Sequence, residues 1–538
     1  MSDVFTAPEA PAGGGAPASR NYDAVVIGGG HNGLVTAAYL AKGGLKTLVL
    51  ERRGVLGGAA ATEAVFPGYR ANTGGYDAGL FLPQIVQDLN LENYGLVFLE
   101  PPALLTSLQP EGASFTLWRD PQRAQAEIER FSPADARKYP DFLRWVERLA
   151  GVLRPLLTLA PPPLPEVSYR ELLPWLPAAL GLKRLGDRDM MELLRLLPLS
   201  VADFLDEWFE SPALKGALAV SAIAGSMQGP MASGTTFLFL YHALGPAGSG
   251  IRASRFIQGG AVRLSEALAD AARQYGAEIC TGVAAQRILA EDGRATGVLL
   301  ESGELVSAPR VVSSAGPRRT FFNLVGAEQL ELRLVREVKN IKFRGSTARL
   351  NLALDGLPRF DLPAEALGGH ILLSPSLEYM ERAYDDAKYG GASRQPILDM
   401  TLPSLIDPSV APPGKHLLTI DVRYAPYHLK DTDWQAEGGA LVDRVIDLLE
   451  GCAPGMKSLV AARQLLTPLD LEREYGLEEG SIYHGQMGLD QLLFMRPVPG
   501  YGSYRTPLAG LYLCGAGSHP GGGLTGAPGY NAAREILK

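Results

Sequence analysis

Three glycines and one acidic residue near the N-terminus have the spacing of a phosphate- and ribose-binding unit. Gly28, Gly30 and Gly33 form a GxGxxG pattern, and Glu51 follows Gly28 by 23 residues. Glycine allows a tight turn at 28, a close approach of the backbone to a pyrophosphate at 30, and close helix–strand packing at 33. A carboxylate such as that of Glu51 accepts hydrogen bonds from a ribose diol. The pattern therefore predicts a dinucleotide site.

Such a site needs a strand, a turn, a helix and a second strand, and the neighbouring sequence supplies all four. Residues 23–27 and 46–51 are apolar runs typical of buried strands, and the small, apolar residues 34–41 predict a helix. The N-terminus of that helix favours an anion because its N–H groups are free. Only one such unit is visible, so we expect no dedicated NAD(P) site and an electron acceptor such as O2, a quinone or another bound oxidant.

The residues after Glu51 favour FAD over NAD as the dinucleotide. Arg52 is followed by Gly57 and Gly58, which resemble the second phosphate-contacting loop of FAD enzymes of the amine oxidase and carotenoid desaturase type. An NAD domain does not need this loop, although an ordinary turn can have the same composition. We expect Arg52, Gly57 and Gly58 to contact the cofactor.

The rest of the nucleotide-binding domain is expected further along the chain. Residues 261–275 have an amphipathic helical pattern, residues 277–289 and 295–306 have strand patterns around a turn, and residues 311–315 form another strand. This order is that of an FAD domain resuming after an insertion. Such a fold places the backbone of Val283 against adenine.

The C-terminal stretch carries the third signal. Residues 510–514 predict a buried strand, residues 524–537 predict a helix, and a glycine-rich loop joins them. That loop suits a backbone that runs against a flat ligand, and the helix dipole would stabilise negative charge on a reduced flavin. The loop residues that we expect at the cofactor are Gly515, Gly517, Gly522 and Gly523.

Together, these motifs resemble the phytoene-desaturase-like FAD-dependent oxidoreductases, with a closer match to the branch named pyridine nucleotide-disulphide oxidoreductase domain-containing protein 2. The resemblance covers residues 22–538, and its supporting segments are residues 405–414, 468–472, 484–491, 496–499 and 511–523. Many members have an acidic residue after the last strand. This chain has Gly517 at or near that place, so contacts to the flavin ribityl chain must come partly from the backbone.

The three cysteines limit what the resemblance implies. The branch name promises a redox disulfide, but Cys280, Cys452 and Cys514 are far apart in sequence and form no CxxC. Relatives with a covalent flavin use a C-terminal cysteine, whereas Cys514 lies on a predicted buried strand. We therefore expect non-covalent FAD. The seven histidines are scattered and form no HExxH, so no metal site is predicted.

The predicted fold class is α/β, with a Rossmann-like FAD-binding domain and an α+β substrate domain built from two insertions. Residues 1–20 are rich in Ala, Pro and Gly and predict a flexible tail. The FAD-binding domain is expected to be discontinuous, over residues 21–105, 250–330 and 490–538. The substrate domain is expected over residues 106–249, which are helix-rich, and 331–489, with a six-stranded sheet over the flavin.

The resemblance implies hydride transfer between flavin N5 and a long apolar, polyene or isoprenoid-like substrate. His519 in the glycine-rich loop and His484 are the candidate catalytic residues, although each can equally be a histidine satisfied by the backbone or the interior. Weaker candidates are Tyr76, Asp77, Arg423, Tyr424 and Tyr427. Two alternatives stay open: a flavin amine oxidase that produces H2O2, and a non-enzymatic protein in which FAD is structural.

Composition bears on partners and location. The net charge of −8 over 538 residues argues against nucleic-acid binding, and no apolar run reaches the length of a membrane span. Without a secretory signal, we expect a cytoplasmic protein. Residues 172–185 are apolar with a basic end and either pack as a hairpin on their own domain, the favoured interpretation, or contact a membrane surface.

Overall fold

A five-stranded parallel sheet organises the nucleotide-binding half of the protein. The computed structural model describes residues 16–110, 113–163, 167–246 and 250–538. The strands have the order β19-β13-β1-β2-β9, and every neighbouring pair is parallel. Their bounds are β1 Ala24–Ile27, β2 Thr47–Glu51, β9 Glu278–Thr281, β13 Val311–Ser313 and β19 Leu511–Leu513. Both faces are covered, which explains the continuous apolar runs in their sequences.

Helices cover one face of this sheet and a small antiparallel sheet covers the other. Helix α1 (His31–Lys42) packs against both α11 (Val262–Gln274) and α18 (Ala527–Ile536). The opposite face carries the three-stranded sheet β10-β11-β12, and the side chains between the two sheets form one apolar cluster. The bounds of its strands are β10 Ala285–Glu291, β11 Arg294–Leu300 and β12 Leu305–Ser307. The predicted α/β fold class with a Rossmann-like domain is confirmed.

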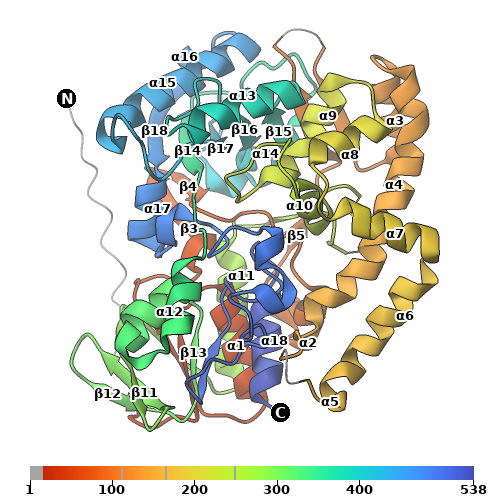
Figure 1. The fold of residues 1–538 in the computed structure, drawn as a ribbon. Coiled ribbons are helices and arrows are strands. Elements are labelled where there is room, and N and C mark those ends of the chain that lie inside the picture. The colour runs from red at the N-terminus through yellow and green to blue at the C-terminus, as the bar shows by residue number, and fades with distance from the viewer. Residues whose placement is uncertain (1–15, 111–112, 164–166, 247–249) are drawn as a thin grey trace.

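A mixed seven-stranded sheet forms the other half of the molecule, above the first in Figure 1. The strands have the order β18-β14-β17-β16-β15-β6-β7. Their bounds are β6 Ala103–Leu108, β7 Phe115–Trp118, β14 Thr347–Leu354, β15 His370–Leu373, β16 Leu398–Thr401, β17 His416–Arg423 and β18 Val460–Leu466. The sequence analysis expected six strands. It took the segment after residue 105 as helical, so the boundary that it placed between residues 105 and 106 falls inside β6.

The two faces of this sheet differ in chemistry because side chains alternate along each strand. One face packs its leucine, isoleucine and valine side chains against α15 (Trp434–Cys452). The other face, here called the polar face, is buried except at Asp421 yet carries hydroxyl, amide and charged groups. Its residues are Thr347, Arg349, Asn351, His370, Asp399, Thr401, Thr419, Asp421 and Arg423.

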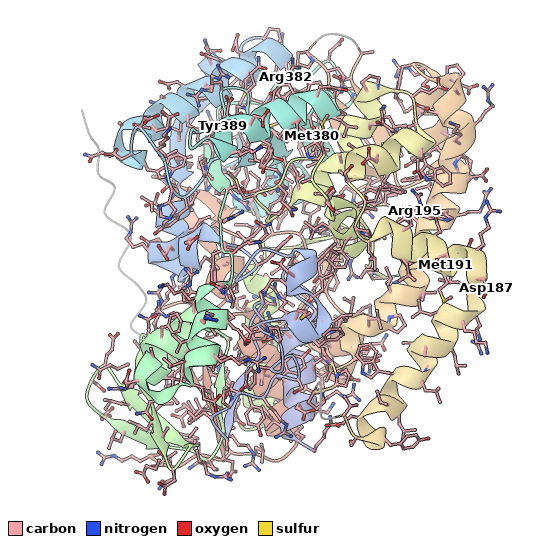
Figure 2. The ribbon with its side chains drawn as sticks, in the orientation of Figure 1. Asp187, Met191, Arg195, Met380, Arg382 and Tyr389 are labelled. Atoms are coloured by element: carbon pink, nitrogen blue, oxygen red, sulfur yellow. The ribbon has the colours of Figure 1, made fainter. Side chains whose placement is uncertain are left out.

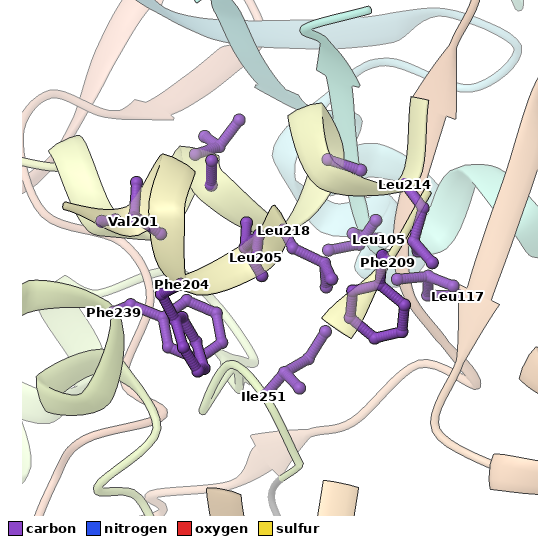
Figure 3. Close-up of a cluster of buried hydrophobic side chains, with 14 of the residues drawn as sticks. Leu105, Leu117, Val201, Phe204, Leu205, Phe209, Leu214, Leu218, Phe239 and Ile251 are labelled. Carbon is purple, nitrogen blue, oxygen red and sulfur yellow. The ribbon is translucent and has the colours of Figure 1, made fainter. Parts of the chain in front are cut away.

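A layer of helices flanks the second sheet, on the right in Figure 1. Several helices begin at a Ser or Asp whose side chain accepts a hydrogen bond from the first turn, followed by Pro at the first helical position. The bounds are α3 Pro121–Glu129, α4 Pro133–Leu153, α5 Tyr169–Leu172, α6 Leu176–Arg184, α7 Asp187–Leu196, α8 Val201–Trp208, α9 Pro212–Ala219 and α10 Thr235–His242. Phe204, Phe209 and Phe239 pack there with Leu105 and Leu117 of the sheet (Figure 3).

Short elements connect these layers. They are α2 Pro83–Asp88, β3 Thr62–Phe66, β4 Tyr69–Asn72, β5 Phe98–Leu99, β8 Phe256–Ile257, α12 Leu332–Lys339, α13 Leu377–Lys388, α14 Pro403–Ile406, α16 Met456–Leu459 and α17 Pro468–Tyr475. Of the tail predicted over residues 1–20, residues 1–15 lie outside the described part. Ala18 donates its backbone N–H to Glu278, and the Arg20 carbonyl accepts from Ser307.

The segment α5–α7 exposes an unusual number of apolar side chains. Tyr169 is 76% exposed, Leu176 55% and Met191 62%. Figure 2 shows Met191 at the outer edge of the molecule, between Asp187 and Arg195 on α7. Leu172, Leu173, Leu180 and Leu194 are also exposed. Within the described ranges, no helix combines the length and the apolarity needed to cross a membrane.

Candidate functional site

A large cavity lies between the carboxyl ends of β1, β2 and β13 and the polar face of the seven-stranded sheet. The space between its lining residues is about 2080 Å³ and includes space open to solvent. The cavity extends from Ala284 and Ala285, past the glycine pattern after β1, to Arg252 and Arg423. Ligands of open parallel sheets bind at this edge of the strands.

The three glycines of the GxGxxG pattern have different physical roles. A Cβ atom at Gly33 would lie 2.1 Å from the Gly28 carbonyl oxygen, and one at Gly28, where φ is +101°, would lie 2.2 Å from Ser314 Oγ. At Gly30 the nearest atom would be 3.9 Å away. Gly28 and Gly33 are thus required by the packing of the protein, whereas the face of Gly30 is open towards the cavity.

The open face of Gly30 lies opposite a second glycine, Gly58, and these two residues are here called the cradle. A Cβ at Gly58, where φ is +56°, would lie 3.4 Å from the Gly30 Cα. Gly30 is also the N-cap of α1 and provides no side-chain cap, so the first N–H groups of that helix stay available for an anion. Gly57, with φ of +112°, packs instead against Ala60. Gly30, Gly57 and Gly58 all line the cavity.

Glu51 lies at the end of β2, where the sequence predicted it. Its carboxylate accepts hydrogen bonds from the N–H of Gly29 at 2.7 Å and of Arg53 at 2.8 Å. Each carboxylate oxygen keeps a further lone pair for a ligand hydroxyl. Arg52 also lines the cavity, and its guanidinium donates to the carbonyl of Glu474 at 2.8 Å. Val283 donates its N–H to the Glu51 carbonyl, and the neighbouring Ala284 lines the cavity.

The glycine-rich loop after β19 differs from its expected role. Of the four glycines predicted at the cofactor, Gly523 lines the cavity. The others pack against the protein. A Cβ would lie 2.4 Å from the Ser314 carbonyl oxygen at Gly515, 2.4 Å from Pro317 at Gly517 and 1.9 Å from the Tyr483 ring at Gly522. Internal packing therefore explains why these three positions have no side chain, and Ala516 between two of them lines the cavity.

His519 does not take the position that the sequence analysis gave it. Its Nε2 is 2.9 Å from the carbonyl oxygen of Leu156, and its own carbonyl accepts from Tyr504 Oη at 2.8 Å. The ring is buried outside the cavity wall, and burial lowers its pKa to about 4. The loop histidine fastens the C-terminal loop to the segment after α4, because that segment offers it a backbone acceptor.

His484 lines the cavity, as expected, and a second histidine does so as well. His484 has φ of +53°, and its Nδ1 is buried without a hydrogen-bond partner among the described residues. His31, inside the GxGxxG pattern, is this second histidine. Burial lowers the pKa of both rings to about 4, and at His31 it outweighs the backbone of Gly523, which raises the pKa. Both rings are therefore neutral at pH 7.

The polar face contributes a network of charged side chains that the sequence analysis largely missed. Asp399 Oδ2 is 3.0 Å from Arg252 Nη2 and 3.0 Å from Arg423 Nη2. Its Oδ1 is 2.7 Å from His370 Nδ1, and the other ring nitrogen of His370 is 3.0 Å from Asp77. Burial raises the pKa of Asp399, but Arg252 and His370 outweigh it and hold that pKa well below its usual value.

A second ion pair continues this network along the sheet. Arg349 lies opposite Asp421 in the register of β14 and β17, and its Nη2 is 2.8 Å from Asp421 Oδ1. The Arg349 guanidinium also lies over the Tyr76 ring, 4.8 Å from its centroid. Arg349, Asp421 and Tyr76 all line the cavity.

A tyrosine–histidine pair completes the wall. His242 Nδ1 is 2.9 Å from the carbonyl oxygen of Leu238, and its Nε2 is 2.9 Å from Tyr483 Oη. A carbonyl only accepts, so Nδ1 carries the proton and Nε2 accepts the proton of the Tyr483 hydroxyl. Burial lowers the pKa of His242 to about 4 and raises that of Tyr483 to about 12. The pair is therefore a neutral acid–base couple facing the cavity.

Five weaker candidates from the sequence divide into two groups. Tyr76, Asp77 and Arg423 line the cavity. Tyr424 and Tyr427 point elsewhere, since Tyr424 Oη donates to the carbonyl of Gln228 at 2.8 Å and Tyr427 Oη donates to Glu472. The alternating polar residues Thr419, Asp421 and Arg423 indicate a polar face of the strand. Nothing local indicated its partners Arg252 and His370.

A Rossmann-like unit, a cavity along its glycine pattern and a second sheet closing over that cavity are the features of a flavin-type oxidoreductase. Residues 26–76 match the family model of the NAD(P)-binding Rossmann-like domain. The chain is 38% identical to pyridine nucleotide-disulfide oxidoreductase domain-containing protein 2 of Rattus norvegicus, over 96% of this chain and 93% of that protein. The chain belongs to this family.

Other relatives extend the same class. A limonene dehydrogenase component of Castellaniella defragrans is 30% identical, over 96% of this chain and 95% of that protein. Phytoene desaturase (lycopene-forming) of a Paracoccus species is 25% identical, over 95% and 96%. A structure of putrescine oxidase has a TM-score of 0.60 at 15% identity, covering 96% of this chain and 98% of that one, and shares the fold. The predicted resemblance to desaturase-like oxidoreductases is confirmed.

The three cysteines lie in the described part of the chain, and all of them are free. Cys514 is fully buried behind the sheet, and burial raises its pKa to about 12. No group of three His, Cys, Asp or Glu side chains among the described residues is arranged to hold a metal ion.

Proposed function

We propose that this protein is an FAD-dependent oxidoreductase that transfers a hydride between its substrate and the flavin. The observation that carries the proposal is one continuous cavity that joins a dinucleotide cradle to a wall of charged and hydrogen-bonding side chains. Gly30 and Gly58 would hold the pyrophosphate, and Glu51 would hold the ribose. Gly74, Gly75, Gly523 and Leu524 line the continuation of the cavity, where the flavin would lie.

Bound FAD supplies a hydride acceptor at N5. The protein must then manage the proton that leaves the neighbouring carbon of the substrate. Tyr483 Oη would take that proton while passing its own proton to His242 Nε2, which lies 2.9 Å away. With bound FAD as the hydride acceptor, the proton would pass to His242, so that two hydrogens would leave the substrate and a double bond would form. The Leu238 carbonyl keeps the imidazole in the accepting tautomer.

The substrate is proposed to have a long apolar, isoprenoid-like body. Leu80, Ala224, Ala253, Ile482 and Leu524 give the cavity apolar stretches of wall. The names of two relatives, limonene dehydrogenase and phytoene desaturase, support a substrate of this kind. We also propose that such a substrate arrives through contact of the exposed α5–α7 side chains with a membrane surface, because Lys183, Arg184 and Arg188 lie in the same segment.

The amine oxidase alternative is less well supported by the site. Tyr512 on β19 and Tyr530 on α18, the tyrosines closest to the C-terminus, do not line the cavity, so they cannot form the aromatic pair that would enclose an amine. That wall instead carries Arg252, Arg349 and Arg423, and their charges oppose a substrate ammonium group. The putrescine oxidase structure shares the fold with this chain, but at 15% identity it does not indicate the substrate.

The test is the visible spectrum of the purified protein before and after denaturation, followed by anaerobic titration with isoprenoid compounds and with putrescine. A flavin spectrum with FAD released on denaturation is expected, and bleaching by an isoprenoid compound identifies the oxidised substrate class. A colourless protein that FAD cannot reconstitute would contradict the cofactor. A yellow protein bleached only by putrescine would favour the oxidase, and one bleached by neither would favour structural FAD.

A further inference from the structure

The charges on the polar face are out of balance where the face meets the cavity. Arg252 and Arg423 share one carboxylate oxygen, Oδ2 of Asp399, at 3.0 Å each. The Arg423 side chain is 7% exposed and that of Asp399 only 1%. Two guanidinium groups and one carboxylate therefore occupy the same buried corner. The neighbouring pair Arg349–Asp421 neutralises itself and leaves the corner unchanged.

The other oxygen of Asp399 does not restore the balance. It faces His370 Nδ1, while His370 Nε2 faces Asp77. Both partners are carboxylates, so both ring nitrogens donate and His370 is an imidazolium. Burial lowers the pKa of His370, but the two carboxylates outweigh it and raise that pKa. Three cationic side chains therefore meet two carboxylates, and one positive charge is left over.

Hydrogen-bond capacity is also left over on the arginines. Arg252 Nη1, Arg349 Nε and Arg423 Nε are buried and have no partner among the described residues. A buried donor without a partner costs about 1–3 kcal/mol. Each such donor calls for a partner such as a ligand or an ordered water. The surplus charge and the surplus donors lie in the same place, beside apolar cavity wall from Leu80, Ala253 and Leu524.

We propose that the substrate carries a carboxylate, which binds between Arg252 and Arg423 while its apolar chain lies along the rest of the cavity. This proposal rests on the proposed function, since it assigns the substrate class of the same site. A single negative charge matches the single surplus positive charge. A phosphate dianion would leave a net buried negative charge beside Asp399 and Asp421, which is costly in a site of low dielectric. A guanidinium fork also fits the planar carboxylate.

The test compares three ligands with the same chain: decanoate, decan-1-ol and decylamine. Each is titrated into the FAD-loaded protein and followed by the perturbation of the flavin absorption bands and by the shift in thermal midpoint. Decanoate is expected to bind about tenfold or more tightly than decan-1-ol, because hydrogen bonds to charged groups contribute about 1.5–3 kcal/mol. Equal binding of decanoate and decan-1-ol, or preference for decylamine, would overturn the proposal.

Three variants assign the effect to the arginine corner. Arg423→Gln is expected to abolish the preference for decanoate over decan-1-ol, and Arg423→Lys, which keeps the charge opposite Asp399, to retain part of it. Arg463→Gln is the matched control, because Arg463 belongs to β18 of the same sheet but lies half-exposed beside Asp443. A decanoate preference that survives in Arg423→Gln would contradict the assignment. Failure of the protein to bind FAD would refute the proposed function instead, and the thermal midpoint would still report on the carboxylate.

Discussion

The ring of Tyr483 packs between two glycines, which leave the space that the ring fills. A Cβ at Gly522 would lie 1.9 Å from the Tyr483 ring, and one at Gly225 would lie 2.4 Å from it. The ring therefore fits between two glycines, and its hydroxyl has one fixed acceptor, His242 Nε2. Rigid placement matters for an acid–base group because proton transfer requires a short and aligned hydrogen bond.

Replacing Tyr483 with phenylalanine should slow reduction of the flavin by substrate without releasing FAD. The variant removes the hydroxyl but keeps the ring that fills the space between the glycines. A positioned acid–base group contributes about 10²- to 10⁴-fold, so a loss of this order is expected in the anaerobic rate of flavin bleaching, together with unchanged flavin content. Tyr139→Phe is the control, since Tyr139 is buried outside the cavity. Equal rates in the two variants would remove Tyr483 from the chemistry.

The individual residues of the site were predictable only where the signal was local. Gly28, Gly30, Gly33 and Glu51 lie within one strand–helix–strand unit, so their spacing sufficed. The partners of Asp399 come from distant elements, and no local pattern connects it with Arg252 or His370. The glycines after β19 show a second limit of prediction from sequence. A glycine can be required by a ligand or by a neighbouring side chain such as Tyr483, and the sequence alone does not distinguish the two cases.

At the scale of elements, two glycines of the turn between β1 and α1 have different roles, one in folding and the other in the proposed binding of the cofactor. Gly33→Ala should destabilise the fold itself, because the added Cβ would lie 2.1 Å from the Gly28 carbonyl. Overpacking of this kind costs about 1–3 kcal/mol. Gly30→Ala should leave the apo protein nearly as stable as the wild type, since its nearest neighbour is 3.9 Å away. It should weaken FAD binding instead.

Thermal unfolding of the apo proteins and fluorescence titration with FAD measure these two effects. A lower unfolding midpoint is expected for Gly33→Ala, and a higher Kd for FAD at a wild-type midpoint is expected for Gly30→Ala. Gly44→Ala is the control. Gly44 lies just beyond α1 with a positive φ and open space around it, so this variant measures the effect of the backbone conformation alone on the unfolding midpoint. If Gly30→Ala bound FAD as tightly as the wild type, the open face of Gly30 would not be the phosphate cradle.

The elements themselves were largely predictable, and the exceptions have a physical cause. Residues 348–354, 397–402 and 416–424 of the second insertion have the alternating pattern of strands, and they are found as β14, β16 and β17. The strands β6 and β7 were missed because they come before the helical layer and join the sheet through β15, far along the chain. Pairing between distant segments leaves no local trace in the sequence.

At the scale of the whole molecule, four histidines with lowered pKa values make the protein sensitive to acid. Burial lowers the pKa of His31, His242, His484 and His519 to about 4, from an ordinary value of 6.5. Between pH 6.5 and 4 the unfolded chain binds protons that the folded chain does not. Their contribution to stability is therefore complete above pH 6.5 and is lost as the pH falls towards 4, at about 1.4 kcal/mol per pKa unit and group.

Urea unfolding at pH 7, 6 and 5 checks this expectation. The free energy of unfolding should fall with each step, and His519→Gln, which changes a histidine outside the cavity, should reduce the slope. His370 has the opposite sign, because its raised pKa adds stability at low pH that is lost only as the pH rises through its folded value. Stability that is independent of pH over this range would show that the four rings are not buried as neutral groups.

Contact with a membrane can be tested on the exposed segment α5–α7. Co-sedimentation with vesicles of phosphatidylcholine and phosphatidylglycerol is expected for the wild type, because apolar and basic side chains occur together in this segment. Leu176→Asp should reduce it severalfold. Leu332→Asp is the control, since Leu332 is 88% exposed but lies on α12. Equal sedimentation of both variants would exclude α5–α7 as the contact.

The strand order β19-β13-β1-β2-β9 also bears on when the proposed cofactor could bind during synthesis. The strand β1 and the glycine pattern after it are made first, but Gly523 and Leu524 belong to the last few per cent of this sequence. A growing chain on the ribosome thus carries an incomplete cavity, with the apolar edge of β13 uncovered until β19 arrives. The proposed FAD would consequently bind late, and a chain shortened before residue 511 should accumulate without colour.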